Sequence, residues 1–145
     1  MTKRQRLIRA VWQLYIALLL LFVIMKFDGS LQSLHQRLFS GEPSSNLVPF
    51  RTLRIQWHYL HTAWGRRNLL GNFLPFLPLG FLSPSAFPAL SRPGRFFPFA
   101  LAFLLFAELF QLVTHLGSFD VDDLLLNLLG AALGYRLHPL LTKKA

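Results

Sequence analysis

The sequence predicts an all-α, polytopic membrane protein: a small bundle of four transmembrane helices with an amphipathic outer loop. Of its 145 residues, 53% are hydrophobic and 14% are charged, whereas soluble domains carry roughly 25% charged residues. The apolar residues gather in four segments, each close to the length of about 20 residues that a helix needs to cross the hydrocarbon core. The whole chain, 1–145, is therefore expected to form a single membrane domain.

The first predicted span covers about residues 7–27. From Ala10 to Met25 its one clearly polar residue is Gln13. The basic residues before it are typical of a signal peptide, but no small-residue cleavage site follows the apolar run. We therefore expect an uncleaved membrane anchor.

The other three predicted spans cover about residues 69–90, 96–116 and 124–141. The segment 69–90 is uncharged but contains prolines at positions 75, 78, 84 and 88. Each proline removes a backbone donor and favours a kink. The second span is therefore expected to be bent or partly unwound, with its free backbone groups satisfied by protein or by a wet cavity.

The distribution of basic residues predicts that both termini face the cytoplasm. With the N-terminus inside, nine of the fifteen Lys and Arg residues fall on the cytoplasmic side: Lys3, Arg4, Arg6, Arg9, Arg92, Arg95, Arg136, Lys143 and Lys144. The remaining six fall on the outer side. The excess of basic residues on the inner side of membrane proteins favours this orientation.

The outer loop, about residues 28–68, is the one polar region of useful length. Two sets of apolar residues recur there at helical spacing: Leu31, Leu34 and Leu38, and then Leu53, Trp57, Leu60 and Trp64. The second set lies opposite basic residues: Arg51, Arg54, His58 and His61. This pattern predicts a helix in the headgroup layer. The alternative is a loop that packs on the top of the bundle.

Polar side chains of different spans are expected at a similar depth. At 1.5 Å per residue, Gln111 lies about 7–8 Å below the outer end of its span and Glu108 about 12 Å below it. On neighbouring spans, Asn72 and Asn127 each lie about 5 Å below the same surface. A buried charge costs roughly 2.5 to 3.5 kcal/mol on insertion scales. These groups are therefore expected to contact one another, water or a ligand.

Within each helix the polar residues share a face. Glu108, Gln111 and His115 have the spacing i, i+3 and i+7 on the third span. On the fourth span, Asp123 and Asn127 share a face with the glycines at 130 and 134. Small residues at such spacing allow a neighbouring helix to approach closely.

Several interpretations of this polar interior stay open. Asn, Gln and Glu can hold helices together by hydrogen bonds, and Asp120 is a natural N-cap for the helix that follows it. Carboxylates that lie close together repel one another unless a proton or a cation intervenes. Mg²⁺ or Ca²⁺ is therefore a candidate ligand, with Glu108, Asp122 and Asp123 as candidate metal residues.

Composition excludes other classes of function. The chain has no cysteine, which excludes disulfides, cysteine metal sites and a thiol nucleophile. Its formal net charge is +9, but the apolar runs and the lack of a recognisable binding motif argue against a nucleic-acid partner.

Five motifs occur in an ordered series along the chain: Asn46-Leu-Val-Pro-Phe50, Asn68-Leu-Leu-Gly-Asn72, Pro75-Phe-Leu-Pro-Leu-Gly80, Glu108-Leu-Phe-Gln111, and Asp120-Val-Asp-Asp123 followed by Asn127 and Gly130. The series resembles the VanZ-like family of small bacterial membrane proteins, named for a member associated with resistance to the glycopeptide teicoplanin. The resemblance covers most of residues 7–141. It implies a location in the bacterial cytoplasmic membrane and a role in envelope or antibiotic-related biology.

The leading functional hypothesis is an integral membrane protein that binds an amphiphilic envelope ligand at the outer leaflet. The ligand would be membrane lipid, a lipid-linked cell-wall precursor or a glycopeptide antibiotic. The predicted ligand-binding residues are Asn46, Arg51, Asn72, Glu108, Gln111, Asp120, Asp122, Asp123 and Asn127. One alternative is a carboxylate- or Mg-dependent enzyme that acts on a phosphate- or sugar-bearing lipid. The other is a structural partner in a membrane complex. The sequence leaves the oligomeric state open.

Overall fold

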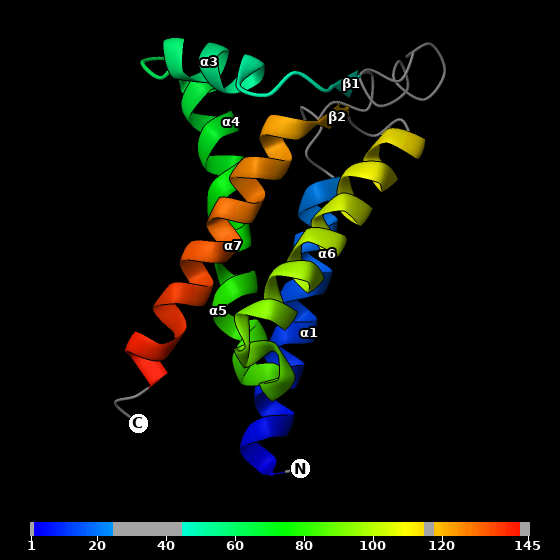
Figure 1. Cartoon of the computed structure of the whole chain (residues 1–145), viewed down its shortest axis with the longest axis vertical. Helices are drawn as coiled ribbons and strands as arrows, with labels where there is room; N and C mark the ends of the chain where they lie inside the picture. Colours follow the sequence, from blue (N-terminus) through cyan, green and yellow to red (C-terminus); the bar gives the residue numbers. More distant parts are fainter. Residues whose placement is uncertain (1, 25–44, 115–117, 143–145) are drawn as a thin grey trace.

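The computed structural model describes residues 2–24, 45–114 and 118–142. The elements in chain order are α1 (Lys3–Ile24), β1 (Ser45–Asn46), α3 (Arg51–His58), α4 (Ala63–Phe73), the 3-10 turn η1 (Leu74–Phe76), α5 (Leu77–Ala86), the 3-10 turn η2 (Pro88–Ser91), α6 (Pro93–Val113), β2 (Phe119–Asp120) and α7 (Val121–Thr142). The long helices run side by side, with both termini at one end of the bundle and α3 across the opposite end (Figure 1). The predicted all-α class is confirmed.

In the described part of the chain, three helical segments are long and apolar enough to cross a membrane: Lys3–Val23, Ala63–Ala86 and Pro93–Val113. They correspond to the first three predicted spans, and they make the chain a membrane protein. The fourth predicted span corresponds to α7, which has 22 residues. That α7 also crosses the membrane stays a prediction.

The second span is interrupted, as its prolines predicted. Pro75 lies in η1 between α4 and α5, and Pro84 lies inside α5. Phe87 then adopts an extended conformation, with φ −131° and ψ 97°, before η2. The helix begins at Ala63 rather than near residue 69, because the Thr62 hydroxyl accepts a hydrogen bond from Gly65 N at 3.1 Å and so caps its first turn.

Polar side chains of α1 bind to this interrupted span. Arg9 Nε donates to Ala86 O at 3.0 Å, Trp12 Nε1 donates to Ser83 Oγ at 3.0 Å, and the Tyr15 hydroxyl donates to Pro75 O at 2.7 Å. Backbone groups near a proline lack some of the usual helical partners. Donors from α1 therefore satisfy acceptors of the irregular span inside the protein, as a membrane requires.

The predicted amphipathic outer segment is divided between two helices, so the expectation of one helical pattern from Leu53 to Trp64 is wrong. α3 ends at His58, and α4 begins after a turn. Gly65 lies so close to the Tyr59 carbonyl that a Cβ would clash with it, so the chain packs tightly where it turns from α3 into α4 (Figure 1). The predicted helical pattern over residues 31–38 lies outside the described residues.

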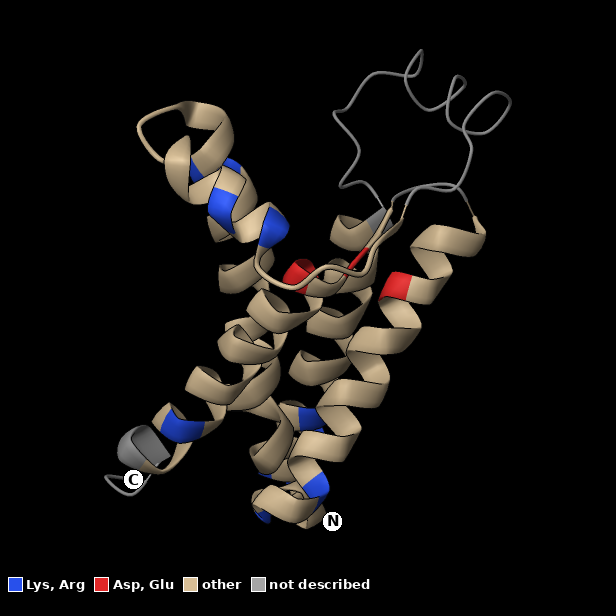
Figure 2. Cartoon of the chain, turned by 45° about the horizontal axis from the view of Figure 1, so that its top comes forward, with Lys and Arg blue, Asp and Glu red and all other residues tan. Residues whose placement is uncertain are grey.

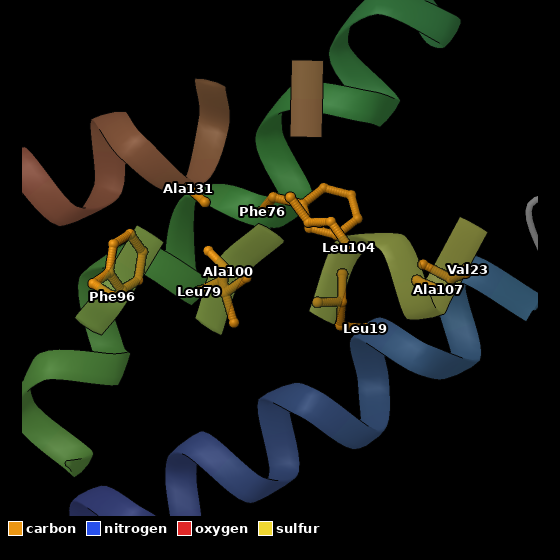
Figure 3. Close-up of a cluster of buried hydrophobic side chains, with 9 residues drawn as sticks. All are labelled: Leu19, Val23, Phe76, Leu79, Phe96, Ala100, Leu104, Ala107 and Ala131. Atoms are coloured by element: carbon orange, nitrogen blue, oxygen red, sulfur yellow. The ribbon is translucent and has the colours of Figure 1, made fainter. Parts of the chain in front are cut away.

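The apolar core lies between α1, α5, α6 and α7 (Figure 3). Its buried members are Leu19, Val23, Phe76, Leu79, Phe96, Ala100, Leu104, Ala107 and Ala131. Three of its members are alanines, Ala100 and Ala107 on α6 and Ala131 on α7, and such small side chains allow neighbouring helices to approach closely.

Glycines bring α5 and α7 into backbone contact. A Cβ on Gly134 would clash with Leu77 O, and a Cβ on Gly80 would clash with Ala131 O. A Cβ on Gly130 would clash with Phe73 O. The predicted close approach at Gly130 and Gly134 is confirmed, and it places α7 directly against the irregular span.

Gly134→Ala is expected to destabilise the bundle by roughly 1 to 3 kcal/mol, because the new methyl must push α5 and α7 apart. Unfolding of the purified protein in detergent, followed by tryptophan fluorescence, would measure this loss. Gly71→Ala is the matched control, since a Cβ at Gly71 meets nothing within 4 Å. Equal stability of the two variants would contradict the close α5–α7 contact.

Candidate functional site

One carboxylate joins the starts of two helices at the end of the bundle that carries α3. Asp122 lies in the first turn of α7 and is 0% exposed. Its Oδ1 accepts a hydrogen bond from Phe50 N at 2.6 Å, and its Oδ2 accepts from Thr52 N at 2.8 Å and from Leu53 N at 3.1 Å. Phe50, at the N-cap position of α3, has no side-chain acceptor of its own. Asp122 therefore caps α3 from a distant part of the chain, where the positive ends of two helix dipoles favour its charge.

The backbone before α3 is shaped to meet this carboxylate. Phe50 has φ 64° and is the one non-glycine residue with positive φ in the described part of the chain. A bulky residue in this left-handed region is uncommon, and such strain persists where the surroundings hold it in place. Here the hydrogen bond from Phe50 N to Asp122 holds it.

Asp120 connects the same two segments through a second network. Its Oδ1 accepts from Asp122 N at 2.8 Å, which confirms the predicted N-cap of α7. Oδ1 also accepts from Asn46 Nδ2 at 3.1 Å, and Oδ2 accepts from the Thr52 hydroxyl at 2.6 Å. In the parallel pair β1–β2, Asn46 lies opposite Asp120. We call Asn46, Thr52, Asp120 and Asp122 the upper network.

A second set of polar residues lies among the spanning helices. Asn72 Nδ2 of α4 donates to Asp123 Oδ1 of α7. Asn127 Nδ2 of α7 donates to Glu108 Oε1 of α6 at 3.4 Å, and Gln111 Nε2 of α6 donates to Val23 O of α1 at 2.9 Å. We call Asn72, Glu108, Gln111, Asp123 and Asn127 the interhelical polar layer.

The interhelical polar layer has little free space. A cavity between Glu108, Gln111 and Asn127 is also lined by Val23 and Phe76, and its volume is about 10 Å³. That is close to the space one water molecule needs. In this conformation, the cavity cannot take a lipid headgroup.

The predicted site residues therefore fall into three groups. Asn46, Asp120 and Asp122 belong to the upper network, and five others form the interhelical polar layer. Arg51 is exposed on α3, next to the amides that Asp122 binds. His115, which the sequence placed on the face of Glu108 and Gln111, lies outside the described residues.

The candidate metal residues are distributed between these groups. Asp122 is engaged by three backbone amides, whereas Glu108 and Asp123 contact the amides of Asn127 and Asn72. Within residues 2–24, 45–114 and 118–142, no group of three or more His, Cys, Asp or Glu side chains is arranged to hold a metal ion. A Mg²⁺ or Ca²⁺ site stays a prediction.

Sequence reasoning missed Thr52 and Gln56. Thr52 both donates to Asp120 and accepts from Asn46 Nδ2 at 3.0 Å. Gln56 is buried on the inner face of α3. Each is a single polar residue in a short helix of mixed composition, so its inward position gave no distinct signal in the hydropathy pattern.

Comparison with known proteins identifies the family. The family model VanZ/LLP1 matches residues 12–142, from α1 to the end of α7. Protein VanZ of Enterococcus faecium is 30% identical over 139 residues, which cover 93% of this chain and 75% of that protein. The chain belongs to the VanZ/LLP1 family. The resemblance based on the five motifs is thereby confirmed. No solved structure matches the chain.

In this VanZ/LLP1 protein, the family-like motifs meet in space. The motif around Asn46 and Phe50 contacts the motif around Asp120 and Asp122, although about 70 residues separate them. The motif containing Asn72 contacts the acidic motif through Asp123, and the Glu108 motif contacts Asn127. The polar residues of these motifs therefore form one connected end of the bundle.

Asp122→Asn is expected to loosen the start of α3, because the amide supplies one acceptor oxygen where the carboxylate supplies two. Hydrogen bonds to a charged group are worth roughly 1.5 to 3 kcal/mol. Hydrogen exchange at the amides of residues 50, 52 and 53 should therefore become roughly 10- to 100-fold faster.

Asp123→Asn is the matched control, since Asp123 lies one position further along α7 and contacts Asn72 instead. Exchange measured by mass spectrometry in nanodiscs would separate the two variants. Unchanged exchange at residues 50–53 in Asp122→Asn would contradict the cap.

Proposed function

We propose that this VanZ/LLP1 protein crosses the bacterial cytoplasmic membrane four times, with both termini in the cytoplasm. We further propose that it binds an amphiphilic envelope ligand at the outer leaflet. The exposed surface of α3 would contact the phosphate or headgroup of a lipid or of a lipid-linked cell-wall precursor, or the polar groups of a glycopeptide antibiotic. The observation that carries the proposal is the buried cap at Asp122, because it fixes a short cationic and aromatic helix at one end of the bundle.

The side chains of α3 support a headgroup-binding surface. Arg51 and Arg54 are exposed one turn apart, and no hydrogen bond or ion pair joins either guanidinium to the described parts of the chain. Trp57 is 71% exposed and Ile55 is 45% exposed on the same short helix. Guanidinium groups match the geometry of phosphate oxygens, and tryptophan favours the interface between membrane and water.

The outer faces of the helices support a membrane position for α7. Leu125, Leu129 and Leu133 are exposed at intervals of four residues along α7, which forms an apolar stripe directed away from the core. A helix of 22 residues is about 33 Å long, enough to cross a hydrocarbon core of about 30 Å.

The charge distribution supports the orientation. Among the described residues, Lys and Arg lie at both ends of the bundle, near the termini and on α3 and α4, whereas the described Asp and Glu residues lie toward the end that carries α3 (Figure 2). More of the Lys and Arg residues of the sequence fall on the side of the termini, nine against six, and such an excess is typical of the cytoplasmic side. The end with α3 would then face outward.

The buried polar residues have a supporting role in this proposal. Glu108, Gln111 and Asn127 surround a space of about 10 Å³, so the ligand would bind on the surface of α3 and not among the spans. The interhelical polar layer would fix the helices on which the α3 surface rests. Direct binding by these residues, or a Mg²⁺ or Ca²⁺ ion among them, would require the spans to separate.

A contribution to antibiotic resistance follows as part of the proposal. The relative from Enterococcus faecium carries the name Protein VanZ, and the sequence motifs resemble a family named for a teicoplanin-resistance protein. A protein that binds a lipid-linked precursor, or the glycopeptide itself, at the outer leaflet would lower the access of the antibiotic to its target.

The double variant Arg51→Gln/Arg54→Gln is expected to weaken binding of a polyprenyl-diphosphate-linked wall precursor roughly 10- to 30-fold. Each basic residue near a membrane surface contributes about 1 kcal/mol toward an anionic partner. The wall precursor and teicoplanin would be titrated separately against the protein in nanodiscs of phosphatidylcholine. Teicoplanin susceptibility of expressing cells would be measured at equal membrane levels of the protein.

The control variant is Lys3→Gln/Arg4→Gln, which loses the same charge at the opposite end of the chain. Equal binding losses in the two double variants would indicate a general charge effect and contradict the α3 site. Binding of neither probe by the wild-type protein would contradict the proposed function itself.

A further inference from the structure

A groove of about 630 Å³ lies at the basic end of the bundle, opposite the α3 surface. It runs between the region where η2 leads into α6 and the C-terminal half of α7. Its wall is largely apolar, from Pro84 of α5 and Phe97 of α6 to Ala132 and Pro139 of α7. A volume of this size falls in the range of small-molecule sites, roughly 300 to 1,000 Å³.

The polar side chains that line the groove differ in their hydrogen bonding. The Tyr135 hydroxyl donates to Ser91 O, and the His138 ring nitrogen Nδ1 lies 3.0 Å from Phe81 O. Arg136 also lines the groove. It is exposed, and no hydrogen bond or ion pair ties its guanidinium to the described residues. One cationic group is therefore available beside an apolar wall.

The charged residues around the groove are basic. Arg92 lies between the lining residues Ser91 and Pro93, and Arg95 follows in the first turn of α6; both are exposed. The described carboxylates are Glu108, Asp120, Asp122 and Asp123. All of them lie toward the other end of the bundle (Figure 2). No acidic residue of the described chain therefore competes for these arginines.

The groove also has the geometry of a lipid site. Ala132 and Pro139 are seven residues apart on α7, which corresponds to about 10 Å along the helix axis. With α7 crossing the membrane as proposed, Arg136 lies toward the terminal end of this length, near the headgroup layer, and Ala132 lies deeper in the hydrocarbon. A molecule with an anionic head and an apolar tail would match this order of groups.

We propose that the groove between η2, α6 and the C-terminal half of α7 binds an anionic phospholipid from the leaflet at the basic end of the bundle. The phosphate contacts Arg136, with Arg92 beside it, and an acyl chain lies along Phe97 and Ala132. The lipid fills the space between α6 and α7 on the side where the prolines of α5 leave the span irregular. This site is independent of ligand binding at the α3 surface, and it rests on the proposed position of α7 in the membrane.

The test uses native mass spectrometry of the full-length protein released from membranes of equal phosphatidylglycerol and phosphatidylethanolamine content. The wild-type protein is expected to retain phosphatidylglycerol preferentially. Arg136→Gln should lower the retention of phosphatidylglycerol roughly fivefold, because one basic residue near an anionic lipid contributes about 1 kcal/mol to binding. Ala132→Phe should lower it as well, because the ring fills the groove without changing the charge.

Two controls match these variants. Lys3→Gln removes one charge at the same end of the bundle, and Leu133→Phe adds a ring to α7 at a position that does not line the groove. Both should retain lipid as the wild type does, and folding of all variants is checked by thermal stability in detergent. Equal retention of the two lipids by the wild type, or equal losses in Ala132→Phe and Leu133→Phe, would overturn the proposal. A dimer that Ala132→Phe dissociates, with lipid retention unchanged, would also overturn it and assign the groove to a second copy.

Discussion

The arrangement of this molecule depends on the burial of one carboxylate, that of Asp122, between the starts of two helices. Burying a charged group away from water costs free energy unless it is hydrogen-bonded. Three backbone amides at the start of α3 supply these hydrogen bonds. Those amides belong to a segment about 70 residues earlier in the chain. The hydrogen bonds that the buried Asp122 carboxylate needs therefore hold the outer segment against α7. Asp120, Asn46 and Thr52 add further hydrogen bonds to the same junction. The strained conformation of Phe50 is a consequence of this junction.

The same principle operates deeper in the bundle. Each polar side chain of the interhelical polar layer contacts a group on another helix, so that α1, α4, α6 and α7 are joined in series. Close backbone contact at Gly80, Gly130 and Gly134 brings α7 against the interrupted span. Together these contacts leave a space of about one water in the interior. The two surfaces that we propose for ligands lie at the two ends: the cationic helix α3 at one, and the groove beside Arg136 at the other.

The fold was largely predictable because long apolar runs, prolines and small residues have direct physical consequences in a membrane. The interruption of the second span follows from Pro75 and Pro84. The contact of Asn127 with Glu108 follows from the similar depth that the rise of a helix gives them. The division of the outer segment was missed, because a hydropathy pattern continues through a turn that Thr62 and Gly65 create by local contact. The role of Asp122 as a cap for a distant helix was also missed. Local sequence indicates a cap for the helix that follows an Asp, and it cannot indicate which remote amides the carboxylate binds.

The most direct test is disulfide formation between cysteines introduced at Ser45 and Phe119, which lie opposite each other in the β1–β2 pair. The chain has no native cysteine, and paired strands about 4.8 Å apart suit a disulfide. We expect rapid oxidation of the cysteine pair Ser45→Cys/Phe119→Cys in native membranes. The pair Ser45→Cys/Val113→Cys should oxidise more slowly. Adding Asp122→Ala, which removes the cap, should slow oxidation of the first pair roughly tenfold. Failure of the first pair to oxidise, or an equal rate with and without Asp122, would contradict the claim that this carboxylate holds the outer segment on α7.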